Sequence, residues 1–221
     1  MSGGVLYLVG TPIGNLEDLS ERAKRILREV NRVAAEDTRR TAKLLQHIGS
    51  EAPLLSFHAH NERSRIPKLI ESLRNGEDIA VVSDAGNPGI ADPCERLVRD
   101  SIDAGITIVP IPGPSAFLTA IAASGLSAGR FRFEGFLPTQ KGARRARLEA
   151  LRYEPATVLF YEAPHRLAQM LEELENEWGD RAIVLARELT KMYEEFWRGS
   201  VKAARIEIEE RPPRGEYVVL V

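Results

Sequence analysis

Short apolar runs alternate with segments of helical periodicity along the first half of the chain. The apolar runs have the length of buried strands and span residues 5–9, 32–35, 79–82 and 106–109. The helical segments repeat apolar residues at three- and four-residue spacing and span 19–30, 38–48, 62–74 and 93–104. Short connections between such elements are typical of a parallel sheet that is covered by helices. The sequence therefore predicts an α/β domain with a mostly parallel sheet and flanking helices.

The pattern changes after residues 110–115, which contain three prolines and one glycine. Strands are predicted at 157–161 and 182–186, with a helix over 164–178 between them. Three later segments, 194–198, 205–209 and 216–221, alternate apolar and polar residues, as antiparallel strands with one wet face do. We therefore predict two α/β domains, 1–111 and 112–221, joined at the proline-rich segment, and a mixed sheet in the second domain.

Composition narrows the classes of function. The formal net charge of −2 gives no overall attraction for nucleic acid, so RNA binding would need a local basic patch. No apolar run of about 18 residues is present, which argues against a membrane span. The single cysteine is typical of a protein from a reducing cytoplasm. The four histidines and one cysteine lack the spacing of metal ligands, and no metal is expected.

Three turns rich in glycine or proline, at 10–15, 83–92 and 110–115, follow predicted strands. The first lacks both the glycine spacing of dinucleotide-binding loops and the lysine of phosphate-binding loops. The second contains Asp84 and Asp92 but no cation, and carboxylates at strand ends often hold ribose hydroxyls or amino groups. Alternatively the two aspartates are turn and helix-cap residues, the favoured interpretation for Asp92 before Pro93. Because all three turns follow strands, we expect them to line one shared crevice. An acidic crevice without a cation suits a neutral or positively charged nucleoside better than ATP or NAD.

Seven ordered blocks between Leu6 and Val221 resemble those of the ribosomal RNA small subunit methyltransferase I family, within the tetrapyrrole-methylase-like group. The blocks are TPIGNLEDLSERA, AAEDTRRTAKLL, SDAGNPGIADP, PIPGPSA, EGFLP, FYEAPHR and LARELTK. The resemblance implies S-adenosylmethionine-dependent 2′-O-methylation of a cytidine in the decoding region of 16S rRNA, by a homodimer. It also implies two α/β domains of the class III methyltransferase type with the cofactor in the cleft between them.

S-adenosylmethionine carries a sulfonium, an ammonium and a ribose diol but no phosphate, which agrees with an acidic, glycine-lined loop. The resemblance places this cofactor against residues from the three turns, the start of the next helix and one later strand. These are Pro12, Asp84, Ala85, Gly86, Ile90, Ser115, Ala116 and Phe160.

A ribose 2′-hydroxyl is a poor nucleophile while protonated, so a general base is expected. Candidates lie at the ends of predicted strands: Glu36, Asp37, Tyr161 and His165, with Glu162 and Glu188 as further possibilities. Each has a structural alternative. Asp37 is a natural N-cap for the following helix, which is the favoured interpretation. Glu162 and His165 flank the proline of a helix start, where capping is the ordinary role.

Four cations lie within seven residues: Lys141, Arg144, Arg145 and Arg147. We predict that they contact RNA phosphates, with Arg39, Arg40 and Arg166 adding to them, although such a run is also typical of a solvated helix face. Two rival functions remain. One is methylation of a porphyrinoid carbon or of a modified histidine by another member of the same fold group. The other is a noncatalytic RNA-binding module that retains a nucleoside pocket.

Overall fold

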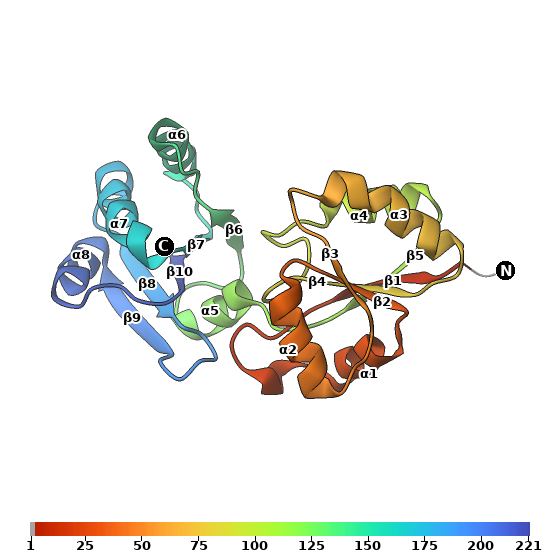
Figure 1. Cartoon of the computed structure of the whole chain (residues 1–221). Coiled ribbons are helices and arrows are strands. Elements are labelled where there is room, and N and C mark those ends of the chain that lie inside the picture. The colour runs from red at the N-terminus through yellow and green to blue at the C-terminus, as the bar shows by residue number, and fades with distance from the viewer. Residues whose placement is uncertain (1–2) are drawn as a thin grey trace. The chain divides into compact units, whose positions relative to one another are not determined.

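The computed structural model describes residues 3–221, and the chain divides after Ser115 into two compact units, each with a five-stranded sheet (Figure 1). The N-terminal sheet has the strand order β3-β2-β4-β1-β5, and every neighbouring pair is parallel. Its strands are β1 (Val5–Val9), β2 (Arg32–Ala35), β3 (Leu54–Ser56), β4 (Ile79–Val82) and β5 (Thr107–Ile111). The predicted parallel α/β domain is confirmed.

Helices cover both faces of this sheet, as Figure 1 shows. The N-terminal helices are η1 (Leu16–Asp18), α1 (Glu21–Glu29), α2 (Thr38–Ile48), α3 (Glu62–Arg74) and α4 (Glu95–Asp103). Helices α1 and α2 pack on one apolar cluster, while α3 and α4 pack on another on the opposite face. Strand β4 is buried at all four positions because it lies in the middle of the sheet, between the two layers. Strand β5 is at the edge, where Pro110 costs no ladder hydrogen bond.

The C-terminal unit has a mixed sheet in the order β6-β7-β10-β8-β9, as predicted. Only β6 and β7 are parallel, and the other pairs are antiparallel. The strands are β6 (Phe131–Phe136), β7 (Thr157–Glu162), β8 (Ala182–Arg187), β9 (Glu195–Ser200) and β10 (Tyr217–Leu220). The helices are α5 (Ala116–Ser124), α6 (Lys141–Leu151), α7 (Pro164–Trp178) and α8 (Val201–Glu210).

The strand predicted at 205–209 is wrong, because this segment belongs to helix α8. The Ser200 side chain accepts a hydrogen bond from the backbone N–H of Ala203 and so caps the helix. Val201 and Ala204 are buried at helical spacing, whereas Ile206 is 59% exposed. The alternation of isoleucine with charged residues resembles the pattern of a half-buried strand. In the structure this segment is helical, and only one side of the helix faces the core.

Candidate functional site

The candidate site lies at the carboxyl edge of the N-terminal sheet. Because all five strands are parallel, the loops that follow them emerge at this one edge. The loops after β1 and β4 are joined by a backbone bridge. The Thr11 N–H donates to the Gly86 carbonyl at 2.8 Å, and the Gly86 N–H donates to the Thr11 carbonyl at 3.0 Å. Two of the three predicted turns are therefore fixed against each other.

The loop after β5 is held against the same pair by close backbone contact. A Cβ atom added to Gly10 would lie 2.7 Å from Gly113 Cα and 2.6 Å from Asn87 Oδ1. The Asn87 side-chain amide in turn donates to the Pro114 carbonyl at 3.2 Å. The turns at 10–15, 83–92 and 110–115 thus form one cluster, and glycine at position 10 is required by space.

We expect Gly10→Ala to force the β1 and β5 loops apart. The neighbouring atoms are mostly backbone, so the cost should be about 1–3 kcal/mol in the free energy of unfolding. Affinity for a ligand held by these loops should fall as well. Chemical denaturation and calorimetric titration with S-adenosylmethionine measure both effects. Gly129→Ala is the matched control, because an added Cβ there meets no atom within 4 Å. Equal behaviour of the two variants would contradict the close-packed cluster.

Asp84 lies at the centre of this edge, after the middle strand β4, and its carboxylate is in contact with a cation. One carboxylate oxygen accepts the backbone N–H of Asp37 at 2.9 Å, and the other lies 3.5 Å from the Arg40 guanidinium. The loop that carries Asp84 contains no cation of its own, and Arg40 comes from α2. The Asp84 carboxylate therefore ties the start of α2 to the loop after β4.

The other predicted cofactor residues differ in their surroundings. Ile90 is 44% exposed in the loop after β4, and Ser115 is buried at the end of the N-terminal unit. Pro12, Ala85 and Gly86 lie in the bridged loops described above. Ala116 is the first residue of α5 and belongs to the C-terminal unit.

Phe160 does not fit its predicted role as a residue that contacts the cofactor. It is fully buried in the core of the C-terminal unit, where its ring lies 6.1 Å from that of Trp178. Successive residues of a strand point to opposite faces of the sheet. The neighbouring Tyr161 is accordingly half-buried on the other face, with its ring 4.8 Å from Phe133 and 5.5 Å from Phe136.

Asp37 caps α2, as the structural alternative for this residue expected. Its carboxylate accepts the backbone N–H of Arg39 at 2.8 Å and pairs with the Arg39 guanidinium at 3.2 Å. These hydrogen bonds hold the pKa of Asp37 below its usual value. Glu36 precedes it at the end of β2 and is half-buried. A carboxylate with a lowered pKa is a weak proton acceptor, so Asp37 is poorly suited to act as a general base.

The candidates around the start of α7 lie in the C-terminal unit. His165 is exposed in the first turn of the helix, and the N-cap is Ala163, so neither His165 nor Glu162 caps it. Glu162 is 2% exposed. One of its oxygens accepts the Ala163 N–H at 2.9 Å and lies 3.3 Å from the Arg166 guanidinium. Burial raises the pKa of Glu162 against the opposing effects of the Ala163 hydrogen bond and Arg166.

Asp92, which was expected to cap a helix, is a further candidate. Helix α4 begins at Glu95 after Cys94, so Asp92 lies two residues too early to cap it. Burial raises the pKa of Asp92 to about 6, reinforced by the charges of Glu36 and Asp84 and opposed by a hydrogen bond with Ser83. Three carboxyl groups thus interact at the ends of β2 and β4, and the pKa of Asp92 approaches neutrality. No local sequence signal distinguishes it from a cap.

Comparison with known proteins gives the family. Residues 5–205 match the model of the tetrapyrrole (corrin/porphyrin) methylases. The chain is 49% identical over 221 residues to a Xylella fastidiosa protein named ribosomal RNA small subunit methyltransferase I, covering 99% of this chain and 81% of that protein. A Bacillus subtilis protein of the same name is 49% identical over 218 residues, which is 99% of this chain and 75% of that protein. The chain belongs to the ribosomal RNA small subunit methyltransferase I family.

Solved structures agree with this assignment at the level of the fold. A diphthine synthase superposes with a TM-score of 0.78 at 17% identity, covering 99% of this chain and 89% of that chain. The methyltransferase CobJ superposes with a TM-score of 0.72 at 22% identity, covering 100% of this chain and 94% of that chain. At these identities the likeness concerns the fold alone.

Members of this family are S-adenosylmethionine-dependent methyltransferases, and the chain is therefore an enzyme of that class. The residues present fit the cofactor. A sulfonium and an ammonium suit the neighbouring carboxylates of Glu36 and Asp84, and the Gly10–Gly113 contact brings the loop backbones together. Within residues 3–221 no group of three or more histidine, cysteine, aspartate or glutamate side chains is placed to bind a metal ion. No helix in the described part of the chain is long and apolar enough to cross a membrane.

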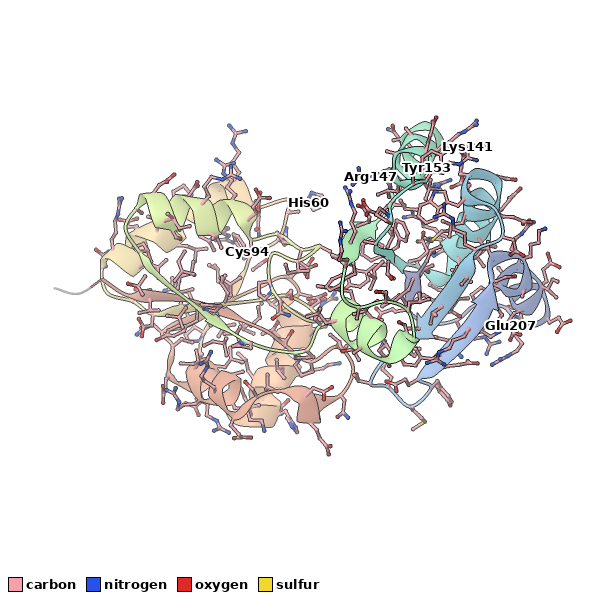
Figure 2. The ribbon with its side chains drawn as sticks, turned by 180° about the vertical axis from the view of Figure 1, so that it is seen from behind. His60, Cys94, Lys141, Arg147, Tyr153 and Glu207 are labelled. Atoms are coloured by element: carbon pink, nitrogen blue, oxygen red, sulfur yellow. The ribbon has the colours of Figure 1, made fainter. Side chains whose placement is uncertain are left out.

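The predicted RNA-binding run lies on α6, and Figure 2 shows Lys141 and Arg147 on this helix. Arg144 is not available for RNA. Its side chain is 5% exposed and forms two contacts with the Glu173 carboxylate, at 2.5 and 2.7 Å. The Arg144 guanidinium also donates to the Thr139 carbonyl at 3.1 Å. The prediction that Arg144 contacts phosphate therefore needs correction, because this residue anchors α6 to α7.

The neighbouring arginines are paired as well, with Arg145 exposed and Arg147 half-buried. Arg145 lies 2.8 Å from Glu177 of α7, and Arg147 lies 2.6 Å from Glu134 of β6. Lys141 is exposed at the start of the helix. Acidic residues of other elements thus compensate much of the charge of this run, a feature that the local sequence does not contain.

A cavity of about 400 Å³ lies elsewhere in the C-terminal unit, between β8, β9, β10 and α8. Its walls include Trp197, Tyr217 and the charged side chains of Arg187, Glu195 and Arg211. Glu195 accepts contacts from both of these arginines, at 3.4 and 3.1 Å. None of the predicted site residues lines this cavity. The positive and negative side chains in its walls compensate one another.

Proposed function

We propose that the enzyme transfers a methyl group from S-adenosylmethionine to the 2′-hydroxyl of a cytidine in the decoding region of 16S rRNA, in the cytoplasm. The observation that carries this proposal is the match of 99% of the chain, at 49% identity, to relatives named ribosomal RNA small subunit methyltransferase I. The joined loops at the carboxyl edge of the N-terminal sheet support it, because they suit a cationic nucleoside. We assign cofactor binding to Pro12, Asp84, Ala85, Gly86, Ile90, Ser115 and Ala116.

The methyl group is activated by its bond to the sulfonium, so the main task of the protein is alignment. Holding the ribose oxygen in line with the methyl group is worth up to about 7–11 kcal/mol relative to a bimolecular reaction. The rigid backbone bridge between Thr11 and Gly86 supports such an arrangement, because it fixes two of the loops. The remaining requirement is removal of the proton from the 2′-hydroxyl.

Asp92 is the residue that we assign to this proton transfer. A general base works best when its pKa is near the operating pH, and burial brings the pKa of Asp92 to about 6. Glu36 contributes by its charge, which raises the pKa of Asp92 further. Among the candidates from the sequence, Tyr161 and His165 remain alternative predictions for the general base.

The test is transfer of labelled methyl groups into three acceptors: small ribosomal subunits that lack the modification, a porphyrinoid, and total cell protein. Label entering the RNA of the small subunit alone is the expected result. Label entering the porphyrinoid or protein would overturn the assignment of substrate. Binding of the subunits without saturable affinity for S-adenosylmethionine would instead indicate a noncatalytic RNA-binding module.

We also propose that the enzyme is a homodimer, as the family resemblance implies. Sedimentation equilibrium should then give twice the chain mass of 24.6 kDa at micromolar concentration. A single species with the mass of one chain would contradict the dimer.

A further inference from the structure

Helix α2 carries an unbalanced set of cations on its exposed side. Its sequence TRRTAKLLQHI contains two arginines, one lysine and one histidine but no acidic residue. The exposed positive and imidazole side chains are Arg39, Arg40, Lys43 and His47, which we term the α2 stripe. Thr41, Leu45 and Ile48 are buried on the opposite side of the helix. The stripe is therefore the solvent side of a helix whose other face is fixed in the core.

The spacing of these residues makes the stripe continuous. Arg39, Lys43 and His47 follow one another at intervals of four residues, which brings them onto one side of the helix. The eight-residue separation of the outer two corresponds to about 12 Å along the helix axis. A row of donors of this length can follow the phosphates of a nucleic acid strand.

The side chains of the stripe are exposed, and only its two arginines form ion pairs within residues 3–221. None of the ion pairs formed within residues 3–221 involves Lys43 or His47. Arg39 is 89% exposed and pairs with Asp37 of the cap, while Arg40 is 66% exposed and 3.5 Å from Asp84. Ion pairs as exposed as these contribute little to stability, so each arginine can readily leave its aspartate for another anion. By contrast, Arg144 on α6 is buried against Glu173.

The stripe begins next to the candidate site. The backbone N–H of Asp37, directly before α2, donates to Asp84 in the loop after β4. The helix then runs away from that loop along one face of the N-terminal sheet (Figure 1). We propose that the α2 stripe binds the phosphate backbone of the RNA substrate and guides it to the carboxyl edge of the sheet. This inference rests on the proposed function.

The test is the double variant Lys43→Gln with His47→Gln, which leaves Arg39 and Arg40 beside the site untouched. Affinity for a 16S rRNA transcript should fall about tenfold at 0.1 M salt. The slope of log affinity against log salt concentration should become shallower by about 0.7–0.9 for each phosphate that the variant no longer neutralises. The melting temperature and the affinity for S-adenosylmethionine should stay at wild-type values, because both side chains are exposed.

Lys68→Gln with Arg74→Gln on α3 is the matched control, since both residues are exposed cations on the opposite side of the same sheet. This control should keep the wild-type affinity and salt slope. Unchanged affinity and slope in the α2 variant would overturn the inference, as would an equal decrease in the control. Failure of the wild-type enzyme to methylate the small subunit would instead overturn the proposed function, so the two failures are distinguishable.

Discussion

Replacing Asp92 by asparagine is expected to lower the rate of methyl transfer by about 10²- to 10⁴-fold, the usual contribution of a general base. Asparagine has nearly the same shape but cannot accept the proton of the 2′-hydroxyl. Affinity for S-adenosylmethionine should change much less than the rate. In the wild-type enzyme the rate should rise with pH through an apparent pKa of about 6, the pKa of Asp92. Single-turnover rates across the pH range measure both effects.

The same substitution should stabilise the protein at high pH. Folding raises the pKa of Asp92 from 3.8 to about 6. The protonated carboxyl group therefore contributes fully to the free energy of unfolding below pH 3.8, and this contribution is lost as the pH rises through about 6. At pH 8 the ionised carboxylate is therefore a cost, which Asp92→Asn removes. We expect a gain of about 1 kcal/mol in the free energy of unfolding, discounted for the partial exposure of the group, and no gain near pH 4.

Asp103→Asn, at the exposed end of α4, is the control for both measurements and should leave rate and stability unchanged. A wild-type rate in Asp92→Asn would exclude Asp92 as the base. A lower rate together with lower stability at every pH would point instead to a structural role for this carboxyl group.

Replacing Glu173 by glutamine should destabilise the C-terminal unit strongly. It leaves the Arg144 guanidinium buried without its counter-charge, since the Arg144 side chain is 5% exposed and that of Glu173 is 15% exposed. Breaking a buried ion pair at one partner costs about 3–5 kcal/mol. Denaturant titration of the variant gives the change in the free energy of unfolding.

Glu177→Gln is the matched control, one helical turn further along α7. Its partner Arg145 is 71% exposed, and an ion pair at the surface contributes about 0–1 kcal/mol. Equal destabilisation of the two variants would show that burial of Arg144 does not govern the stability of this contact. A large effect in Glu173→Gln alone would confirm that Arg144 serves the fold.

The sequence was most informative where a local pattern coincides with the core. Strands β1, β2 and β4 and helices α2 and α3 occur at the predicted residues, because their apolar spacing alone determines which side is buried. The prediction failed for α8, where Ile206 and Ile208 alternate with charges although the helix buries mainly Val201 and Ala204. Strand β3 has only three residues and escaped prediction, since so short a run carries little periodicity.

The candidate site was less predictable, because its properties arise from residues distant in sequence. Glu173 lies 29 residues from Arg144, and without knowing that pair the arginine was expected to be exposed. Asp84 was expected to lack a cation, but Arg40 reaches it from another helix. The unusual pKa of Asp92 depends on burial and on Glu36, neither of which its own loop specifies. The three turns themselves were predictable, because glycine and proline mark them locally.

The position of the transferred methyl group decides whether the enzyme methylates a cytidine ribose in the decoding region. Small ribosomal subunits that lack the modification are incubated with the enzyme and S-adenosylmethionine, and the 16S rRNA is digested to nucleosides and fragments for mass spectrometry. We expect 2′-O-methylcytidine in a single fragment from the decoding region, and its near absence with Asp92→Asn. A methyl group on a base, or on a ribose outside that region, would contradict this expectation.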